Sequence, residues 1–257
     1  MNAMQFLTSA WVWNPLALLF AAGALSAYFG CFGWSRCAWW MVAAAVIFLF
    51  TLMSPLAALA ADYLFSAHML QHILLVLVVP ALALMALPAS AQLSPRPARL
   101  LHPAVCWGCG VVAMWVWHAP ALCNAAATSH WVSAVQTLSL LALGAAFWWQ
   151  LLAPSESQRI APLQGVLYLF AACAACTVLG IILTFSPVTV CRAYLHPVDR
   201  LGIASFIDET WGMTPLRDQQ IGGLIMWVPM CLVYLGAICG QLARWYAMPA
   251  DTPLPNT

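Results

Sequence analysis

The sequence predicts an all-α membrane protein that crosses the bilayer seven times. Of its 257 residues, 65% are apolar and only 6% are charged, whereas a soluble domain carries roughly 25% charged residues. Seven apolar runs are close to the length of about 20 residues that a helix needs to span a bilayer. The runs lie near residues 14–34, 37–60, 64–88, 103–118, 131–153, 163–186 and 218–246.

Proline and charge separate the runs, and nothing in the sequence divides the chain into further domains. The breaks fall at Arg36, Pro55, Pro120, between Pro88 and Pro103, and between Pro154 and Pro162. We therefore expect residues 1–257 to form a single helical bundle. Its one long loop is expected over 187–217, and the polar tail 249–257 is expected to be disordered.

The arginines predict the orientation of the spans. With seven spans, one side collects five arginines in short loops or at the C-terminal end, and the other collects Arg192, Arg200 and Arg217 in the long loop. Because basic residues favour the cytoplasmic side, the N-terminus is predicted outside and the C-terminus in the cytoplasm. The five arginines are Arg36, Arg96, Arg99, Arg159 and Arg244.

Composition and missing motifs exclude several functions. The chain has no lysine and too few charges for a basic patch, so nucleic-acid binding and a lysine Schiff base are excluded. The serine-hydrolase elbow and the His-Glu-x-x-His zinc motif are also missing. We therefore expect no catalytic activity.

The histidines gather at one predicted end of the bundle. His68 and His72 are four residues apart in the third span, so they share one helical face. His118 ends the fourth span and His130 precedes the fifth, both on the outer side. An ionisable side chain at membrane depth is costly and usually functional. This pattern predicts a metal site near the outer surface.

Thioethers and carboxylates accompany these histidines. Met69 lies between His68 and His72, and Met114 is one turn before His118. Imidazole with thioether favours copper, above all Cu(I). Asp62 and Asp218 are expected to orient imidazoles or to guide the ion from the outer surface.

Other sulfur patterns leave two interpretations open. Met226 and Met230 are four apart in the seventh span, where packing is as good an explanation as metal binding. Two Cys-x-x-Cys pairs inside apolar runs fit either close helix packing or a soft-metal relay. The pairs are Cys106 with Cys109 and Cys173 with Cys176. A single buried histidine can likewise be a hydrogen-bonded core residue.

Four segments resemble the CtaG-type cytochrome c oxidase assembly factors, which are integral membrane proteins of bacteria. The segments are Phe65 to Leu75 (FSAHMLQHILL), Met114 to Pro120 (MWVWHAP), Leu179 to Pro187 (LGIILTFSP) and Asp218 to Pro229 (DQQIGGLIMWVP). With Phe147-Trp148-Trp149 they extend over about 50–245.

The resemblance implies a multi-pass protein of the bacterial inner membrane that assists copper insertion into a haem-copper oxidase. It points to His68, His72 and His118 as the polar core of the site. The implied partners are the copper-bearing oxidase subunit, a periplasmic copper chaperone and membrane lipid. Two further histidines of relatives fall on Ser133 and Thr137 here, and a common tyrosine falls on Cys191, which is either a substitute soft ligand or drift.

Two alternatives belong to other classes. The first is a b-type electron-transfer protein in which His72 and His118, from two helices, ligate haem. The second is a copper permease, which needs ligands that continue through the bilayer. Cys106, Cys173 and Cys176 are the candidates for such a path.

Overall fold

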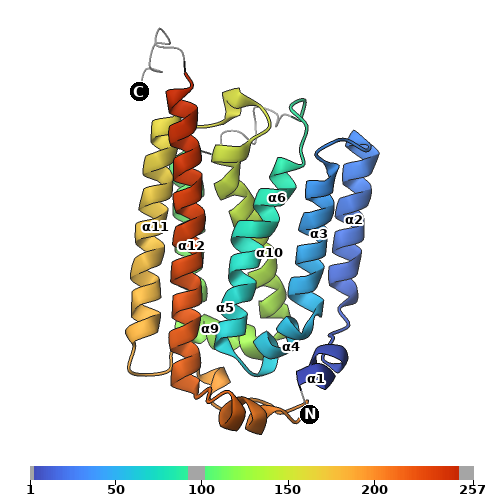
Figure 1. The fold of residues 1–257 in the computed structure, drawn as a ribbon, viewed down its shortest axis with the longest axis vertical. Coiled ribbons are helices and arrows are strands. Elements are labelled where there is room, and N and C mark those ends of the chain that lie inside the picture. Colours follow the sequence, from blue (N-terminus) through green and yellow to red (C-terminus); the bar gives the residue numbers. More distant parts are fainter. Residues whose placement is uncertain (1–2, 92–101, 249–257) are drawn as a thin grey trace.

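The computed structural model describes residues 3–91 and 102–248, and these residues form helices and no strand. The expected tail 249–257 and the loop arginines Arg96 and Arg99 lie outside the described residues. The helices run roughly parallel along the long axis of the molecule (Figure 1). They are α1 (Ala3–Ser9), α2 (Pro15–Phe32), α3 (Ala38–Met53), α4 (Pro55–Asp62), α5 (Phe65–Ile73), η1 (Leu74–Val78), α6 (Val79–Met85), α8 (Pro103–Trp117), α9 (Pro120–Thr128), α10 (His130–Leu152), η2 (Glu156–Gln158), α11 (Pro162–Phe185), η3 (Arg192–Tyr194), η4 (Phe206–Thr210) and α12 (Pro215–Tyr246).

Five helices of the described chain are long and apolar enough to cross a membrane, and two bent pairs bring the number to as many as seven. The pairs are α3 with α4, bent by 46°, and α8 with α9, bent by 74°. The prediction of an all-helical, multi-pass chain is therefore confirmed, and seven is the upper count. Neither bend was predicted. Pro120 was expected to follow the end of a span, and the second span, 37–60, was expected to include Pro55 without a bend.

Proline begins six of the eleven α-helices of the described residues instead of only separating them. Pro at the first helical position loses no hydrogen bond, since that N–H has no partner within the helix. The residue before often caps the helix: the Asn14 and Ser54 side chains accept the N–H groups of Ala17 and Leu56. The helices that begin at proline are those starting at Pro15, Pro55, Pro103, Pro120, Pro162 and Pro215.

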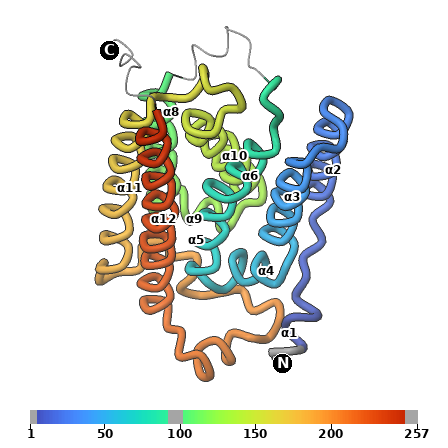
Figure 2. Tube along the Cα trace, turned by 45° about the horizontal axis from the view of Figure 1, so that its top comes forward, coloured from blue at the N-terminus to red at the C-terminus, as the bar shows by residue number. Residues whose placement is uncertain are grey.

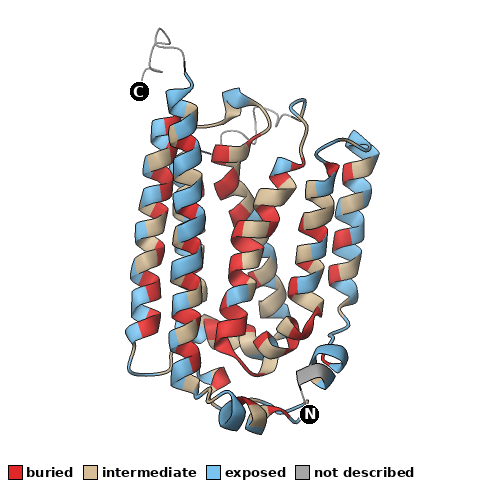
Figure 3. Cartoon of the chain, viewed as in Figure 1, coloured by how far each residue is buried: buried red, intermediate tan, exposed pale blue. Residues whose placement is uncertain are grey.

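Helix α5 with its continuation through η1 and α6 is the central element of the bundle. Over half of its apolar stretch is buried, a larger share than in the other long spans of the described chain. Helix α12 packs on one side of it, α10 and α3 pack on the other, and α11 lies along α12 (Figure 2). The outer faces carry apolar side chains such as Leu19 and Leu167, which are about 70% exposed, as expected for contact with lipid (Figure 3).

A π-helical turn, η1, follows directly after His72. Pro80 has no N–H to give the carbonyl of Val76 four residues earlier, and its ring would clash with that carbonyl. The chain widens instead, so that the N–H of Val79 bonds to the carbonyl of Leu74. Such single π turns are frequent at functional sites. Nothing in the hydropathy pattern revealed it.

Glycines let α12 approach both of its neighbours closely. A Cβ added at Gly222 would meet the Phe65 ring at 2.7 Å and Met69 Cγ at 3.2 Å. A Cβ at Gly223 would lie 2.7 Å from the backbone nitrogen of Thr184 in α11. The adjacent glycines therefore set the distance from α12 to α5 on one side and to α11 on the other.

We expect Gly223→Ala to destabilise the folded protein by about 1–3 kcal/mol, because the backbone of α11 must move to admit the methyl group. The measurement is thermal unfolding of the detergent-purified protein. Gly236→Ala in the same helix is the control, because nothing lies within 4 Å of a Cβ at that position. Equal melting temperatures for the two variants would contradict the close packing.

Candidate metal centre

A carboxylate from α12 fixes the start of the helix that carries the first two histidines. Asp218, only 2% exposed, accepts the backbone N–H of Phe65 at 2.6 Å and that of Ser66 at 3.0 Å. An anion at a helix N-terminus satisfies unpaired N–H groups and complements the helix dipole. Both oxygens of Asp218 are therefore engaged with the backbone of α5, and the structure places this residue as a cap of the helix.

The structure brings His68, His72 and His118 together at the buried junction of α5 and α8. The ring centroids of His68 and His72 are 4.4 Å apart, and those of His72 and His118 are 5.2 Å apart. All three side chains are at least nine-tenths buried. The three histidines that the resemblance implied as the polar core are therefore neighbours in space.

His118 has a defined tautomer. Its Nδ1 is 2.6 Å from the carbonyl oxygen of Met114, which can only accept a hydrogen bond, so Nδ1 carries the proton. In the neutral ring Nε2 then holds a lone pair, and it lies 3.1 Å from the Met69 sulfur. The thioether has no proton to give. Two atoms with lone pairs, His118 Nε2 and the Met69 sulfur, therefore face each other.

Further ring nitrogens of the cluster lack a partner. They are Nε2 of His68 and at least one nitrogen of His72, whose other nitrogen has only the Gln136 side chain beside it. Leaving a buried polar group unpaired costs about 1–3 kcal/mol. A bundle that retains this cost at several adjacent atoms has the signature of a binding site and not of a hydrogen-bonded core.

Gln136 of α10 joins the cluster, and the sequence analysis missed it. It is 3% exposed, it lies against His72, and its amide nitrogen has no hydrogen-bond partner. The available signal was a long polar side chain within the fifth apolar run. It lies between Ser133 and Thr137, the positions at which the resemblance placed two histidines of relatives.

The remaining predicted site residues divide into two groups. Met69 and Met114 are buried beside the cluster. Both contact His118, Met69 with its sulfur and Met114 with its carbonyl oxygen. His130 is exposed at the first residue of α10. Asp62 pairs with Arg200 of the long loop at 3.7 Å, so its carboxylate faces a guanidinium.

Residues 188–194, here called the cap, cover the cluster. Gln219 of α12 accepts the N–H of Val190 at 2.6 Å and donates to the carbonyls of Val188 and Leu183. Tyr194 donates its hydroxyl to the carbonyl of Ala60 at 2.7 Å, and its ring centroid is 6.1 Å from that of His68. The cap is thus held to α4 and α12, and Gln219 also bonds to α11.

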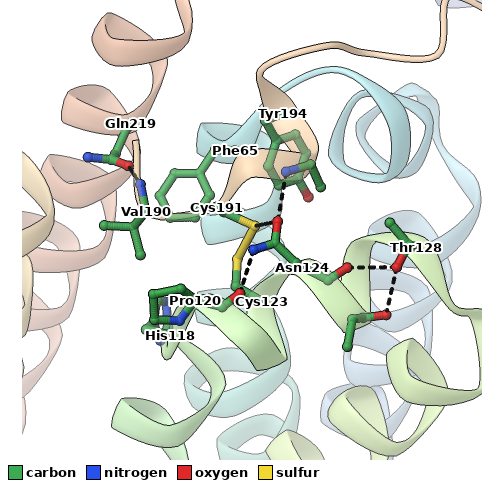
Figure 4. Close-up of a disulfide and its surroundings, with 12 residues drawn as sticks. Phe65, His118, Pro120, Cys123, Asn124, Thr128, Val190, Cys191, Tyr194 and Gln219 are labelled. Carbon is green, nitrogen blue, oxygen red and sulfur yellow. Dashed lines mark hydrogen bonds between the residues drawn. A yellow bond between two sulfur atoms is a disulfide. The ribbon is translucent and has the colours of Figure 1, made fainter. Parts of the chain in front are cut away.

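A disulfide joins the cap to α9. Cys191, fully buried in the cap, is bonded to Cys123, which lies five residues after His118 (Figure 4). The next residue, Asn124, accepts the N–H of Ala193 at 2.8 Å and donates to the carbonyl of Pro120 at 2.6 Å. The pairing answers the question that the sequence left open for Cys191, because its sulfur is committed to Cys123 and not to a metal.

The two Cys-x-x-Cys pairs have different surroundings in the structure. Cys106 is buried and accepts from Gln150, whereas Cys109 is exposed. Cys173 of α11 contacts Cys231 of α12, with 2.9 Å between the sulfur atoms, while Cys176 is buried at another position. Helical spacing placed Cys173 and Cys176 on one face, but the partner of Cys173 comes from a different helix.

The ligand set at the cluster is a mixed one. Within the described residues, no three His, Cys, Asp or Glu side chains are arranged to hold a metal ion. The donors that do converge are neutral imidazoles and one thioether. Such ligands suit Cu(I), which accepts few ligands and favours soft ones, better than they suit Zn²⁺ or Ca²⁺.

Fold and site together define a multi-pass helical membrane protein with a buried histidine and thioether cluster under a disulfide-bonded cap. A family model described as cytochrome c oxidase caa3 assembly factor (Caa3_CtaG) matches residues 18–248. The chain therefore belongs to this family of oxidase assembly factors. No curated protein and no solved structure matches the chain.

We expect maleimide labelling of the denatured, unreduced protein to modify eight of its ten cysteines, because Cys123 and Cys191 are bonded to each other. After reduction, all ten are expected to react. Mass spectrometry of the labelled chain gives the count, and peptide mapping identifies the protected pair. Ten labels before reduction would contradict the disulfide.

Proposed function

We propose that this chain binds Cu(I) at the cluster of His68, His72, His118 and Met69 and passes it to the copper-bearing subunit of cytochrome c oxidase. The observation that carries the proposal is the facing pair of donors, His118 Nε2 and the Met69 sulfur, 3.1 Å apart and buried. Neither can hydrogen-bond to the other, so a soft cation is the species that both would stabilise.

The neutral ligand set suits transfer. Four carboxylates or thiolates would hold a copper ion tightly, whereas imidazole and thioether donors leave it exchangeable. In this proposal the protein makes and breaks only metal–ligand bonds, so it acts as a metallochaperone and not as an enzyme. A periplasmic copper chaperone is the proposed donor of the ion, and lipid surrounds the bundle.

We further propose that the cluster lies at the outer side of the bacterial inner membrane, with the N-terminus outside and the C-terminus in the cytoplasm. The Cys123–Cys191 disulfide supports this orientation, since disulfides form and persist in oxidising compartments. Helix α1 lies at the same end of the bundle as the cap, and α12 ends at the opposite one (Figure 1).

The size of the neighbouring cavity argues against haem. The cavity next to the cluster holds about 20 Å³, whereas sites for small-molecule cofactors hold about 300–1,000 Å³. His72 and His118 are also too close, at 5.2 Å between ring centroids, to admit an iron porphyrin between them.

We expect the detergent-purified wild-type protein to carry copper and the His68→Ala/His72→Ala variant to carry about one copper per chain less. Elemental analysis for copper, iron and zinc is the measurement. His130→Ala is the matched control, because it removes an exposed imidazole at the same end and is expected to retain the copper.

The same variants test the cellular role. Cells with His68→Ala/His72→Ala in place of the wild type are expected to contain normal amounts of this protein and little active oxidase. Iron in place of copper would favour the haem alternative. Equal copper contents in the wild type and the double variant, or normal oxidase activity with that variant, would overturn the proposal.

A further inference from the structure

A small cavity lies one helical turn deeper in the bundle than the histidine cluster. Its volume is about 20 Å³, which is room for a single water-sized particle. Val76, one turn after His72, and Met114, one turn before His118, both line it. The carbonyl of Met114 accepts the hydrogen bond from Nδ1 of His118. Met114 therefore belongs both to the cavity lining and to the histidine cluster.

Three sulfur-bearing residues from three helices line this space. They are Met114 of α8, Cys176 of α11 and Met230 of α12. All three are at most 4% exposed. The other lining residues are apolar apart from Tyr234, whose hydroxyl is a hydrogen-bond partner of the Cys176 thiol.

Water is a poor occupant of such a space. A buried water needs two to four polar partners, and here the two polar groups of the lining are bonded to each other. Methionine usually fills irregular gaps in a core, yet a gap remains between these side chains. The chemistry that the lining does offer is soft: two thioethers and one thiol.

We propose that this cavity is a second binding site for Cu(I), formed by Cys176, Met114 and Met230. Binding of Cu(I) displaces the thiol proton of Cys176, which leaves to the solvent, and the charge of the resulting thiolate cancels that of the monovalent ion, so the complex is neutral as a whole. Neutrality decides the choice of metal, because an uncompensated charge is very costly in a low-dielectric interior. A divalent ion with one thiolate would leave a buried positive charge.

The second site complements the first. At the histidine cluster all ligands are neutral, so bound Cu(I) keeps its positive charge there. The deeper site neutralises the ion and offers only sulfur, which Cu(I) prefers. The cavity therefore provides a storage position next to the transfer position. This inference goes beyond the proposed function, and its ligands are a separate set from the histidines.

The test is a titration of the full-length protein in detergent with Cu(I), under nitrogen, with ascorbate as the reductant and bicinchoninate as the competing chelator. The His68→Ala/His72→Ala protein is expected to bind one equivalent, and X-ray absorption is expected to show a coordination shell of sulfur alone. Adding Cys176→Ala and Met230→Leu to that protein is expected to abolish the remaining equivalent.

Cys173→Ala/Cys231→Ala, added to the same histidine variant, is the matched control. These two thiols lie on the same pair of helices and contact each other, but they do not line the cavity. We expect this protein to retain the sulfur-bound equivalent. Met230→Leu alone preserves side-chain volume, and it is expected to weaken the affinity at the deeper site at least about tenfold without lowering the melting temperature.

Two results would overturn the second site. One is a histidine variant that binds no copper at any concentration. The other is a retained equivalent that survives Cys176→Ala with Met230→Leu or disappears in the Cys173→Ala/Cys231→Ala control. Failure of the proposed function gives a different pattern, in which the wild type and the histidine variant bind the same single, sulfur-bound equivalent.

Discussion

The bond between Asp218 and the start of α5 is the interaction on which the rest of the site depends. It joins the N-terminal turns of two helices that are more than 150 residues apart in sequence. Because both carboxylate oxygens are bonded to α5, they fix the rotation of α5 about its own axis and its position along α12. Gly222 then allows the two helices to approach each other closely. Only with α5 in that position do His68 and His72 face the end of α8.

The cap completes the burial of the histidine cluster that α5 and α12 position. Its contacts come from three helices, through Cys123 and Asn124 of α9, Gln219 of α12 and the carbonyl of Ala60 in α4. The three imidazoles are at least nine-tenths buried, so few of their nitrogens can reach solvent. The same burial lowers the local dielectric constant and strengthens any ion–ligand interaction formed there.

Local sequence patterns predicted the spans and much of the site. Apolar run length placed α10 and α11 to within a few residues, because the bilayer thickness fixes the length of such a helix. The four-residue spacing of His68 and His72 placed both imidazoles on one face, and the structure brings them together. His118 followed from the topology, since the fourth span ends at the level where the third begins.

The parts that sequence reasoning missed depend on contacts between distant segments. Gln136 approaches His72 from another helix, and the Cys123–Cys191 bond joins residues 68 positions apart. Asp62 and Asp218 were both expected near imidazoles, but a carboxylate takes the nearest strong partner. For Asp62 that partner is a guanidinium, and for Asp218 it is a pair of backbone N–H groups. Hydropathy contains no information about these choices.

The disulfide also sets an order of events during biogenesis. Cys123 follows the fourth span and Cys191 follows the sixth, so the bond waits until both segments have been translocated. With that end outside, the nascent chain in the cytoplasm has an open, incomplete cluster. The cap closes only after export and oxidation. Under the proposed orientation, the covalent link therefore delays the finished cluster until this end of the protein has reached the oxidising side of the membrane.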